Sequence, residues 1–95
     1  MYVILLRFSA NKANAPEHMA AHREWIKKGV DEGVFLLVGS IRSGQGGAIL
    51  STDSSLEALE SRVNEDPFVR YDIVKAEIVD IDPNIVSPEL ALLTN

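Results

Sequence analysis

The sequence predicts an α+β fold with the element order β-α-β-β-α-β and a four-stranded antiparallel sheet. Three observations predict this order. Four apolar segments have the composition of strands, two segments with helical periodicity separate them, and a Gly-containing turn at 43–46 joins the middle strands into a hairpin. At 95 residues the chain has room for a single hydrophobic core. We therefore expect one domain over residues 1–82, followed by a tail over residues 83–95.

The first predicted strand runs from Tyr2 to Phe8 and carries apolar side chains on both faces. Tyr2, Ile4, Leu6 and Phe8 share one face, and Val3, Leu5 and Arg7 share the other. A second apolar strand, Val34–Ile41, has no polar alternation in its first half, which predicts burial on both faces. A third strand is expected over Gly47–Thr52.

The first helix is expected to start at Asn14 or Ala15, because Pro16 and Glu17 suit a first helical turn. It should run to about Asp31 and stop at Gly33. Its predicted apolar stripe consists of Met19, Ile26 and Val30, with Trp25 on one flank.

The second helix is predicted to start with a capping box in which Ser54 is the cap and Glu57 reaches back to it. Leu56, Leu59 and Val63 form its inner stripe. It must end before Pro67, so that Asp66-Pro67-Phe68 is expected to be a turn. Ile73–Ile81 is expected to be the last strand, half exposed and at an edge of the sheet.

Two helices can cover only one face of a four-stranded sheet, yet the first two strands are apolar on both. Pairing with a second copy through the uncovered face would bury it, so a homodimer is expected. In the tail, Ser87-Pro88-Glu89 resembles a helix start, and Leu90, Leu92 and Leu93 would form a short amphipathic turn. This tail either docks on the dimer or frays.

Composition excludes several classes of function. The net charge of −5 and the lack of a Lys/Arg cluster longer than Lys27-Lys28 argue against nucleic acid as a partner. There is no cysteine, so disulfides, thiolate metal sites and a cysteine nucleophile are absent. The apolar run from Tyr2 is broken at Arg7 and is too short for a membrane span. A cytoplasmic protein without membrane contact is expected.

The strongest candidate for chemistry is His22, which lies between Met19 and Ile26 on the apolar stripe and so points toward the sheet. An inward histidine needs a polar partner, and Asp66, held at the turn before Pro67, is the carboxylate we expect. The pair would form a base and its orienting group. The alternative is structural, with His22 satisfied in the core and Asp66 capping the turn at Phe68–Val69.

Other candidate residues carry weaker signals. His18 and His22 have the spacing of two metal ligands, but no third ligand is evident and no metal or cofactor is predicted. Arg7 would hold an anionic group or emerge at the end of its strand. Trp25 and Phe68 would wall an apolar pocket, with Tyr71 nearby, or else contribute to the core or the dimer. No serine sits in a Gly-flanked elbow, which argues against Ser-His-Asp hydrolysis.

The stretch from His22 to Gly33, the apolar strand ending at Gly39, and Asp66-Pro67-Phe68 resemble, in that order, the YciI-like (YCII-related) proteins. The resemblance extends to Asp82. It implies a ferredoxin-like, dimeric α+β barrel with His22 and Asp66 as the active-site pair. Two positions depart from the family pattern: Met19 stands where many members have Arg, and Gly39-Ser40 where many have Gly-Pro.

The resemblance implies a small-molecule enzyme of lyase, isomerase or dehydrohalogenase type that transfers protons through His22 and Asp66. For such an enzyme, we expect the substrate-binding residues to be Arg7, Trp25, Ser40 and Phe68. The alternative is a non-catalytic, dimeric protein that binds a small ligand or serves an accessory role. An oxygenase or haem-related role rests on analogy with other α+β barrels alone.

Overall fold

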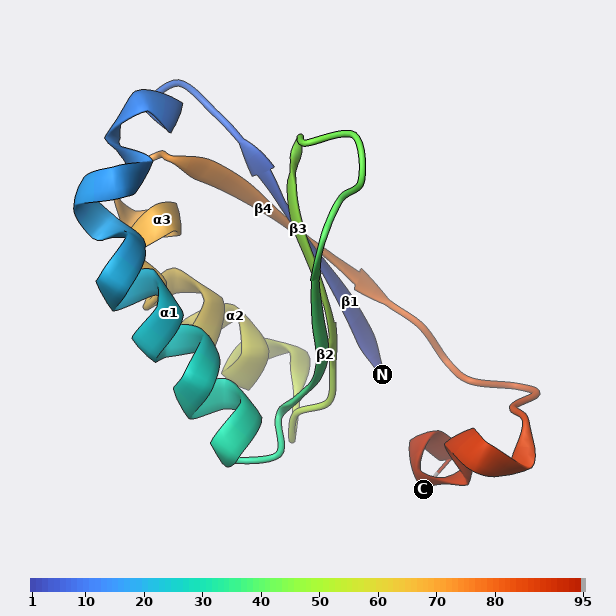
Figure 1. The fold of residues 1–95 in the computed structure, drawn as a ribbon. Coiled ribbons are helices and arrows are strands. Elements are labelled where there is room, and N and C mark those ends of the chain that lie inside the picture. The colour runs from blue at the N-terminus through green and yellow to red at the C-terminus, as the bar shows by residue number, and fades with distance from the viewer. Residues whose placement is uncertain (95) are drawn as a thin grey trace.

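The computed structural model describes residues 1–94 and has the predicted β-α-β-β-α-β order (Figure 1). Its elements are β1 (Tyr2–Phe8), α1 (Ala15–Asp31), β2 (Phe35–Ser40), β3 (Gly46–Ser51), α2 (Leu56–Asn64), α3 (Pro67–Arg70) and β4 (Val74–Asp80), with 3₁₀ turns at η1 (Lys12–Asn14) and η2 (Pro88–Thr94). None of the helices in this part of the chain has the length and apolar content that a membrane crossing requires.

The four strands form one antiparallel sheet in the order β2-β3-β1-β4. The predicted fold class is therefore confirmed, as is the edge position of β4. In the centre of the sheet, Ile4 of β1 is paired with Ile49 of β3 and Ile78 of β4. Both long helices lie on one face of the sheet (Figure 1), and Ile4 belongs to the same buried cluster as Trp25 of α1 and Leu59 of α2.

The hydrophobic core fills the layer between this face and the helices. Ile4, Ile49, Leu59 and Ile73 are fully or almost fully buried in it. The ring of Trp25 meets the ring of Phe35 edge to face, with 5.0 Å between the ring centroids. Burying such rings and aliphatic side chains is the main favourable contribution to folding.

Helix α1 has the predicted bounds, and Gly33 ends it in a left-handed conformation with a φ of 75°. Its buried face differs from the predicted stripe. Val30 is 47% exposed, whereas Trp25 and Gly29 are buried. The prediction for Val30 was wrong because the helix is turned so that the Trp25 indole, the largest side chain available, fills the space above Phe35.

Two predicted local features need correction. The cap of α2 is Ser55, whose Oγ accepts a hydrogen bond from the Ala58 amide at 3.1 Å, and not Ser54. Asp66-Pro67-Phe68 begins a four-residue helix, α3, rather than forming a simple turn. For α2 the sequence offers two neighbouring serines that can cap, and the packing of the helix decides which one does. For α3 the cap is Asp66, and Pro67 at the first position suits a helical turn.

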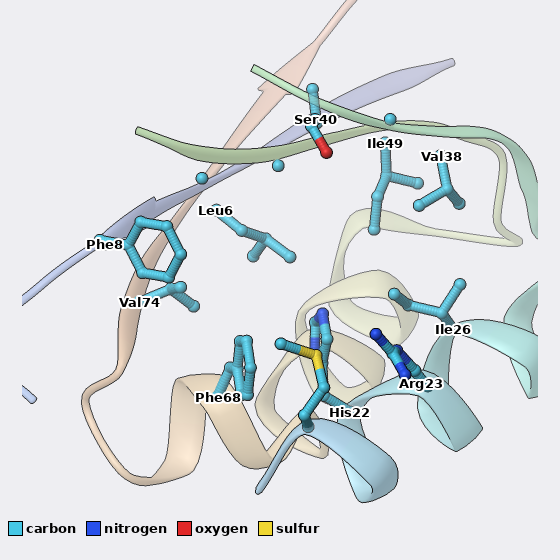
Figure 2. Close-up of a pocket in the computed structure, with 15 residues that line it drawn as sticks. Leu6, Phe8, His22, Arg23, Ile26, Val38, Ser40, Ile49, Phe68 and Val74 are labelled. Atoms are coloured by element: carbon cyan, nitrogen blue, oxygen red, sulfur yellow. The ribbon is translucent and has the colours of Figure 1, made fainter. Parts of the chain in front are cut away.

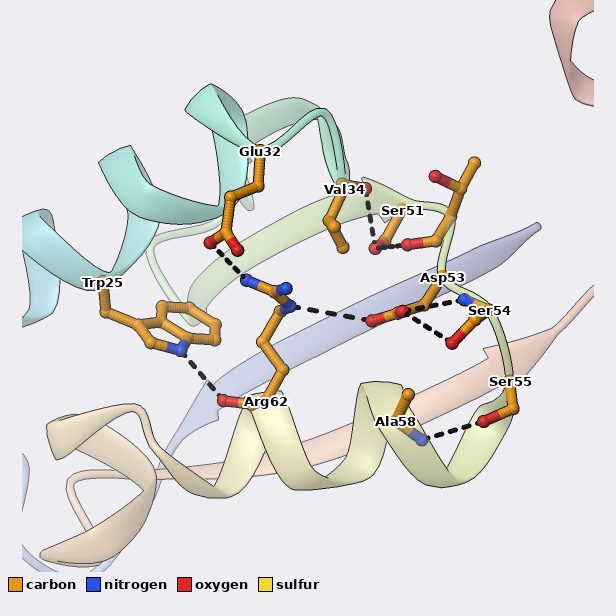
Figure 3. Close-up of polar contacts among 10 residues, drawn as sticks. Trp25, Glu32, Val34, Ser51, Asp53, Ser54, Ser55, Ala58 and Arg62 are labelled. Atoms are coloured by element: carbon orange, nitrogen blue, oxygen red, sulfur yellow. Dashed lines mark hydrogen bonds and ion pairs between the residues drawn. The ribbon is translucent and has the colours of Figure 1, made fainter.

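A set of polar contacts holds α1, α2 and the β3–α2 connection together (Figure 3). The Trp25 Nε1 donates to the Arg62 carbonyl at 2.9 Å. The Arg62 guanidinium lies 3.2 Å from Glu32 and 3.6 Å from Asp53. The hydrogen bond with Glu32 raises the pKa of Arg62, so the guanidinium keeps its charge at this partly buried position.

Within residues 1–94, no helix lies over the opposite face of the sheet, here called the open face (Figure 1). The register places Val3, Leu5, Leu37, Leu50 and Val79 on this face. The prediction that β2 is buried on both faces is wrong for the single chain, since Leu36, Leu37 and Val38 are 41%, 58% and 39% exposed. The tail after β4 leads away from the sheet rather than across the open face (Figure 1).

Gly29 marks the closest approach of α1 to β2. A Cβ atom at this position would lie 2.2 Å from the Phe35 ring. We expect Gly29→Ala to lower the free energy of unfolding by about 1–3 kcal/mol, because the steric conflict outweighs the better helix propensity of alanine. Urea denaturation measures this change.

Gly39→Ala is the control, because a Cβ at Gly39 would meet no atom of the described residues within 4 Å. Its effect should stay within about 0.5 kcal/mol. A Gly29→Ala protein as stable as Gly39→Ala would show that Phe35 can move away at little cost.

Candidate functional site

His22 and Asp66 form a direct hydrogen bond between α1 and the start of α3. The His22 Nδ1 and the Asp66 Oδ1 lie 2.7 Å apart. The histidine side chain is 13% exposed and the aspartate side chain is fully buried. Residues 44 positions apart in the sequence therefore meet at the base of a partly open site.

The carboxylate determines which histidine nitrogen carries the proton. An ionised carboxylate can only accept, so Nδ1 donates to Asp66 and the Nε2 of a neutral ring is left with its lone pair. No hydrogen-bond partner of Nε2 occurs among the described residues, and the ring lines a pocket. The arrangement is that of a base whose ring is oriented through its other nitrogen.

Asp66 also performs the capping role that the sequence suggested as an alternative. The same Oδ1 accepts a hydrogen bond from the Phe68 amide at 3.0 Å, and Pro67 occupies the first position of α3. The Asp66 Oδ2 is buried and has no partner in the described part of the chain. The hydrogen bonds from His22 and from the Phe68 amide thus offset the free-energy cost of burying this carboxylate.

Phe68 fixes the plane of the histidine ring. The two rings are nearly parallel, with an angle of 3° and a centroid distance of 3.9 Å. The Trp25 ring lies farther away, at 6.0 Å from the His22 ring. Since the imidazole is bonded at Nδ1 and stacked on one ring face, few rotamers remain open to it.

The pocket in front of His22 has a volume of about 400 Å³ and lies between α1 and the helix-covered face of the sheet (Figure 2). Most of its wall is apolar. The larger apolar side chains on this wall are Leu6, Phe8, Met19, Ile26, Val38, Ile49, Phe68 and Val74. Its size and lining suit a small, largely apolar molecule.

The structure brings together some of the predicted site residues and separates others. His22, Ser40 and Phe68 line the pocket, and Asp66 lies buried behind His22. Arg7 lies on the open face, where its guanidinium is 2.7 Å from Glu77. Trp25 is buried beside α2 and is not among the lining residues. Arg7 thus emerges at the end of its strand, and Trp25 contributes to the core, as the alternative interpretation of each residue had it.

His18 lies outside the pocket that His22 lines. Its ring stacks on Tyr71 at a centroid distance of 4.3 Å. Within residues 1–94, no group of three or more His, Cys, Asp or Glu side chains is arranged to hold a metal ion.

The sequence interpretation missed Arg23, which lines the pocket next to His22. A signal for it was available, since Arg23 directly follows His22 and precedes Ile26 by three positions, on the same side of the helix. Gly46 and Gly47 also border the pocket. At Gly46 a Cβ would lie 1.9 Å from the Leu6 carbonyl oxygen, so no side chain can occupy this part of the wall.

The fold and site together define a small α+β protein of the ferredoxin-like type with a His-Asp pair in a pocket beneath the sheet. Its structure is similar to that of 5-chloro-2-hydroxyhydroquinone dehydrochlorinase (TftG) from Burkholderia phenoliruptrix AC1100, solved in complex with 2,5-dihydroxybenzoquinone. The TM-score is 0.69 at 14% sequence identity, over 85% of this chain and 93% of that one. At this identity the similarity shows a shared fold.

No protein-family model matches the chain, and no curated protein matches it in sequence. The resemblance to YciI-like proteins remains a prediction from the motifs.

The double role of Asp66 predicts a large effect on stability. We expect Asp66→Ala to lower the free energy of unfolding by about 2–4 kcal/mol, because it removes a helix cap and leaves two buried donors unpaired. Asp66→Asn keeps an acceptor oxygen and should cost roughly half as much. Urea denaturation compares both with Glu65→Ala, which removes the same charge from an exposed neighbour. Equal stability of Asp66→Ala and Glu65→Ala would contradict the role given to this carboxylate.

Proposed function

We propose that this protein is a small-molecule enzyme of the YciI-like kind, in which His22 transfers a proton and Asp66 orients it. The 2.7 Å contact between His22 Nδ1 and Asp66 Oδ1 carries the proposal, together with the position of the ring in an apolar pocket. A base held in one orientation in a partly dry site is suited to proton abstraction.

The reaction class that we favour is elimination or isomerisation of a small cyclic compound. His22 Nε2 takes a proton from carbon or oxygen, the electron pair of the broken bond forms a new double bond, and a leaving group such as halide departs with its own electron pair. In an elimination the imidazolium then returns the proton to solvent. In an isomerisation no group leaves, the existing double bond shifts, and the imidazolium returns the proton to another atom of the substrate. The shared fold with a dehydrochlorinase supports this choice.

Chloride release from 5-chloro-2-hydroxyhydroquinone tests the reaction, and 2,5-dihydroxybenzoquinone is the probe for binding. We expect His22→Asn to reduce turnover by about 10²- to 10⁴-fold. Asparagine places an amide N–H near the position of Nδ1, so the contact with Asp66 and the fold should persist while Nε2 is lost. His18→Asn, on the same helix and outside the pocket, should keep its activity.

Turnover that survives in His22→Asn would contradict the proposal. Binding of the quinone without turnover by the wild-type protein would favour the alternative, a non-catalytic protein that binds small ligands. If the histidine ring signals in the NMR spectrum of the wild-type protein do not respond to the quinone, the pocket is not its binding site.

We also propose that the open face pairs with a second copy of the chain. Its apolar residues Val3, Leu5, Leu37, Leu50 and Val79 come from all four strands and so form a continuous patch. Arg7 and Glu77 add a charged pair at one end of the face. In the tail, Ile85 and Leu92 are 95% and 58% exposed, and a partner would also supply apolar surface for them.

A charge placed on the open face should weaken this association. We expect Leu37→Lys to shift the protein from dimer to monomer at micromolar concentration, because a lysine there would be buried without a partner. Val30→Lys is the matched control, since Val30 is a comparably exposed valine on the outer side of α1. Analytical ultracentrifugation measures both variants. A wild-type monomer, or a Leu37→Lys dimer as strong as that of Val30→Lys, would contradict this assignment.

A further inference from the structure

The described residues that line the pocket in front of His22 include basic side chains but no acidic ones. Among the 15 residues that line it, His22 and Arg23 have the only basic side chains, and none is acidic. The rest of the wall consists of apolar side chains, glycines and Ser40. An anion would therefore meet attraction from Arg23 and no carboxylate on the wall.

Arg23 forms no ion pair in the described part of the chain, whereas three of the other Lys and Arg side chains do. The remaining five also form none among the described residues, but they lie outside the pocket. Arg7 is bound to Glu77 at 2.7 Å, Lys27 to Asp31 at 2.7 Å, and Arg62 to Glu32 at 3.2 Å. The sequence explains the difference, because the helix positions three and four residues from Arg23 hold Met19, Ala20, Ile26 and Lys27. The N–H donors of the Arg23 guanidinium are therefore free of intrachain acidic partners in the described part of the chain and can bind a ligand.

The polar side chains of the pocket all border the same cavity. Arg23 follows His22 on α1, and its side chain lies beside those of His22 and Ile26 (Figure 2). Ser40 faces them from β2, with its hydroxyl directed into the pocket (Figure 2). A base, a cation and a hydroxyl donor therefore border a space whose other walls are apolar.

We propose that the pocket selects small cyclic acids, and that Arg23 is the residue that recognises their anionic oxygen. The apolar walls take up the ring, Arg23 binds a carboxylate, phenolate or enolate oxygen, and Ser40 donates a second hydrogen bond. This inference rests on the proposed function, since it names the substrate class of the same site. It also gives Arg23 a role in the reaction. When His22 takes a proton from the substrate, negative charge develops on the substrate, and the guanidinium stabilises that charge.

Benzoate and benzamide test the charge preference, because they share size and shape and differ in charge. We expect the wild-type protein to bind benzoate at least about 10-fold more tightly than benzamide in isothermal titration. Arg23→Gln should weaken benzoate binding by about 10- to 100-fold and benzamide binding by less than about 3-fold, because glutamine can still donate to a neutral carbonyl but lacks the charge. Lys28→Gln is the control for net charge, since it removes one positive charge from an exposed position of α1 outside the pocket.

Equal affinity of the wild-type protein for the two probes would overturn the proposal, as would no binding of benzoate at millimolar concentration. An equal effect of Arg23→Gln and Lys28→Gln would also overturn it, because the preference would then come from the overall charge. The test is separable from that of the proposed function. Benzoate binding that depends on Arg23 can coexist with unchanged turnover in His22→Asn, and loss of turnover in His22→Asn can coexist with a pocket that ignores charge.

Discussion

The hydrogen bond between His22 and Asp66 is the interaction around which the site is organised. It joins the middle of α1 to the start of α3, and its acceptor is fully buried. A buried carboxylate is costly unless donors surround it, so Asp66 requires both the His22 ring and the Phe68 amide. One oxygen atom thus connects the orientation of a helix, the cap of a second helix and the tautomer of a histidine.

The fold serves this contact by holding its two elements rigidly against the sheet. Trp25, three residues after His22, packs on Phe35 and donates to the Arg62 carbonyl, which fixes α1 over the core. Phe68, two residues after Asp66, is buried and stacks on the imidazole. The same short segments therefore supply both the reactive groups and their packing, and the pocket opens on the one side of His22 that remains uncovered.

Sequence patterns predicted a large part of this arrangement. Helix α1 was expected at its observed bounds, because Pro16 and Gly33 mark its ends by local stereochemistry. The His22–Asp66 contact was expected, since an inward histidine needs a polar partner. The errors concern Val30, Ser54 and, for the single chain, the burial of β2. Each depends on how an element is turned or covered by others, and neighbouring residues offered equally good local choices.

The sequence by itself determined the order of the elements, the two faces of the strands and the candidate pair, because these follow from local stereochemistry and side-chain periodicity. Only the tertiary structure decided which cation faces the pocket. Arg7 was one candidate, with emergence at the end of its strand as the alternative, and its pairing with Glu77 holds it on the open face. Arg23 lines the pocket instead, because the rotation of α1 about its axis is set by the packing of Trp25 and Gly29 against Phe35, a contact between segments distant in the sequence.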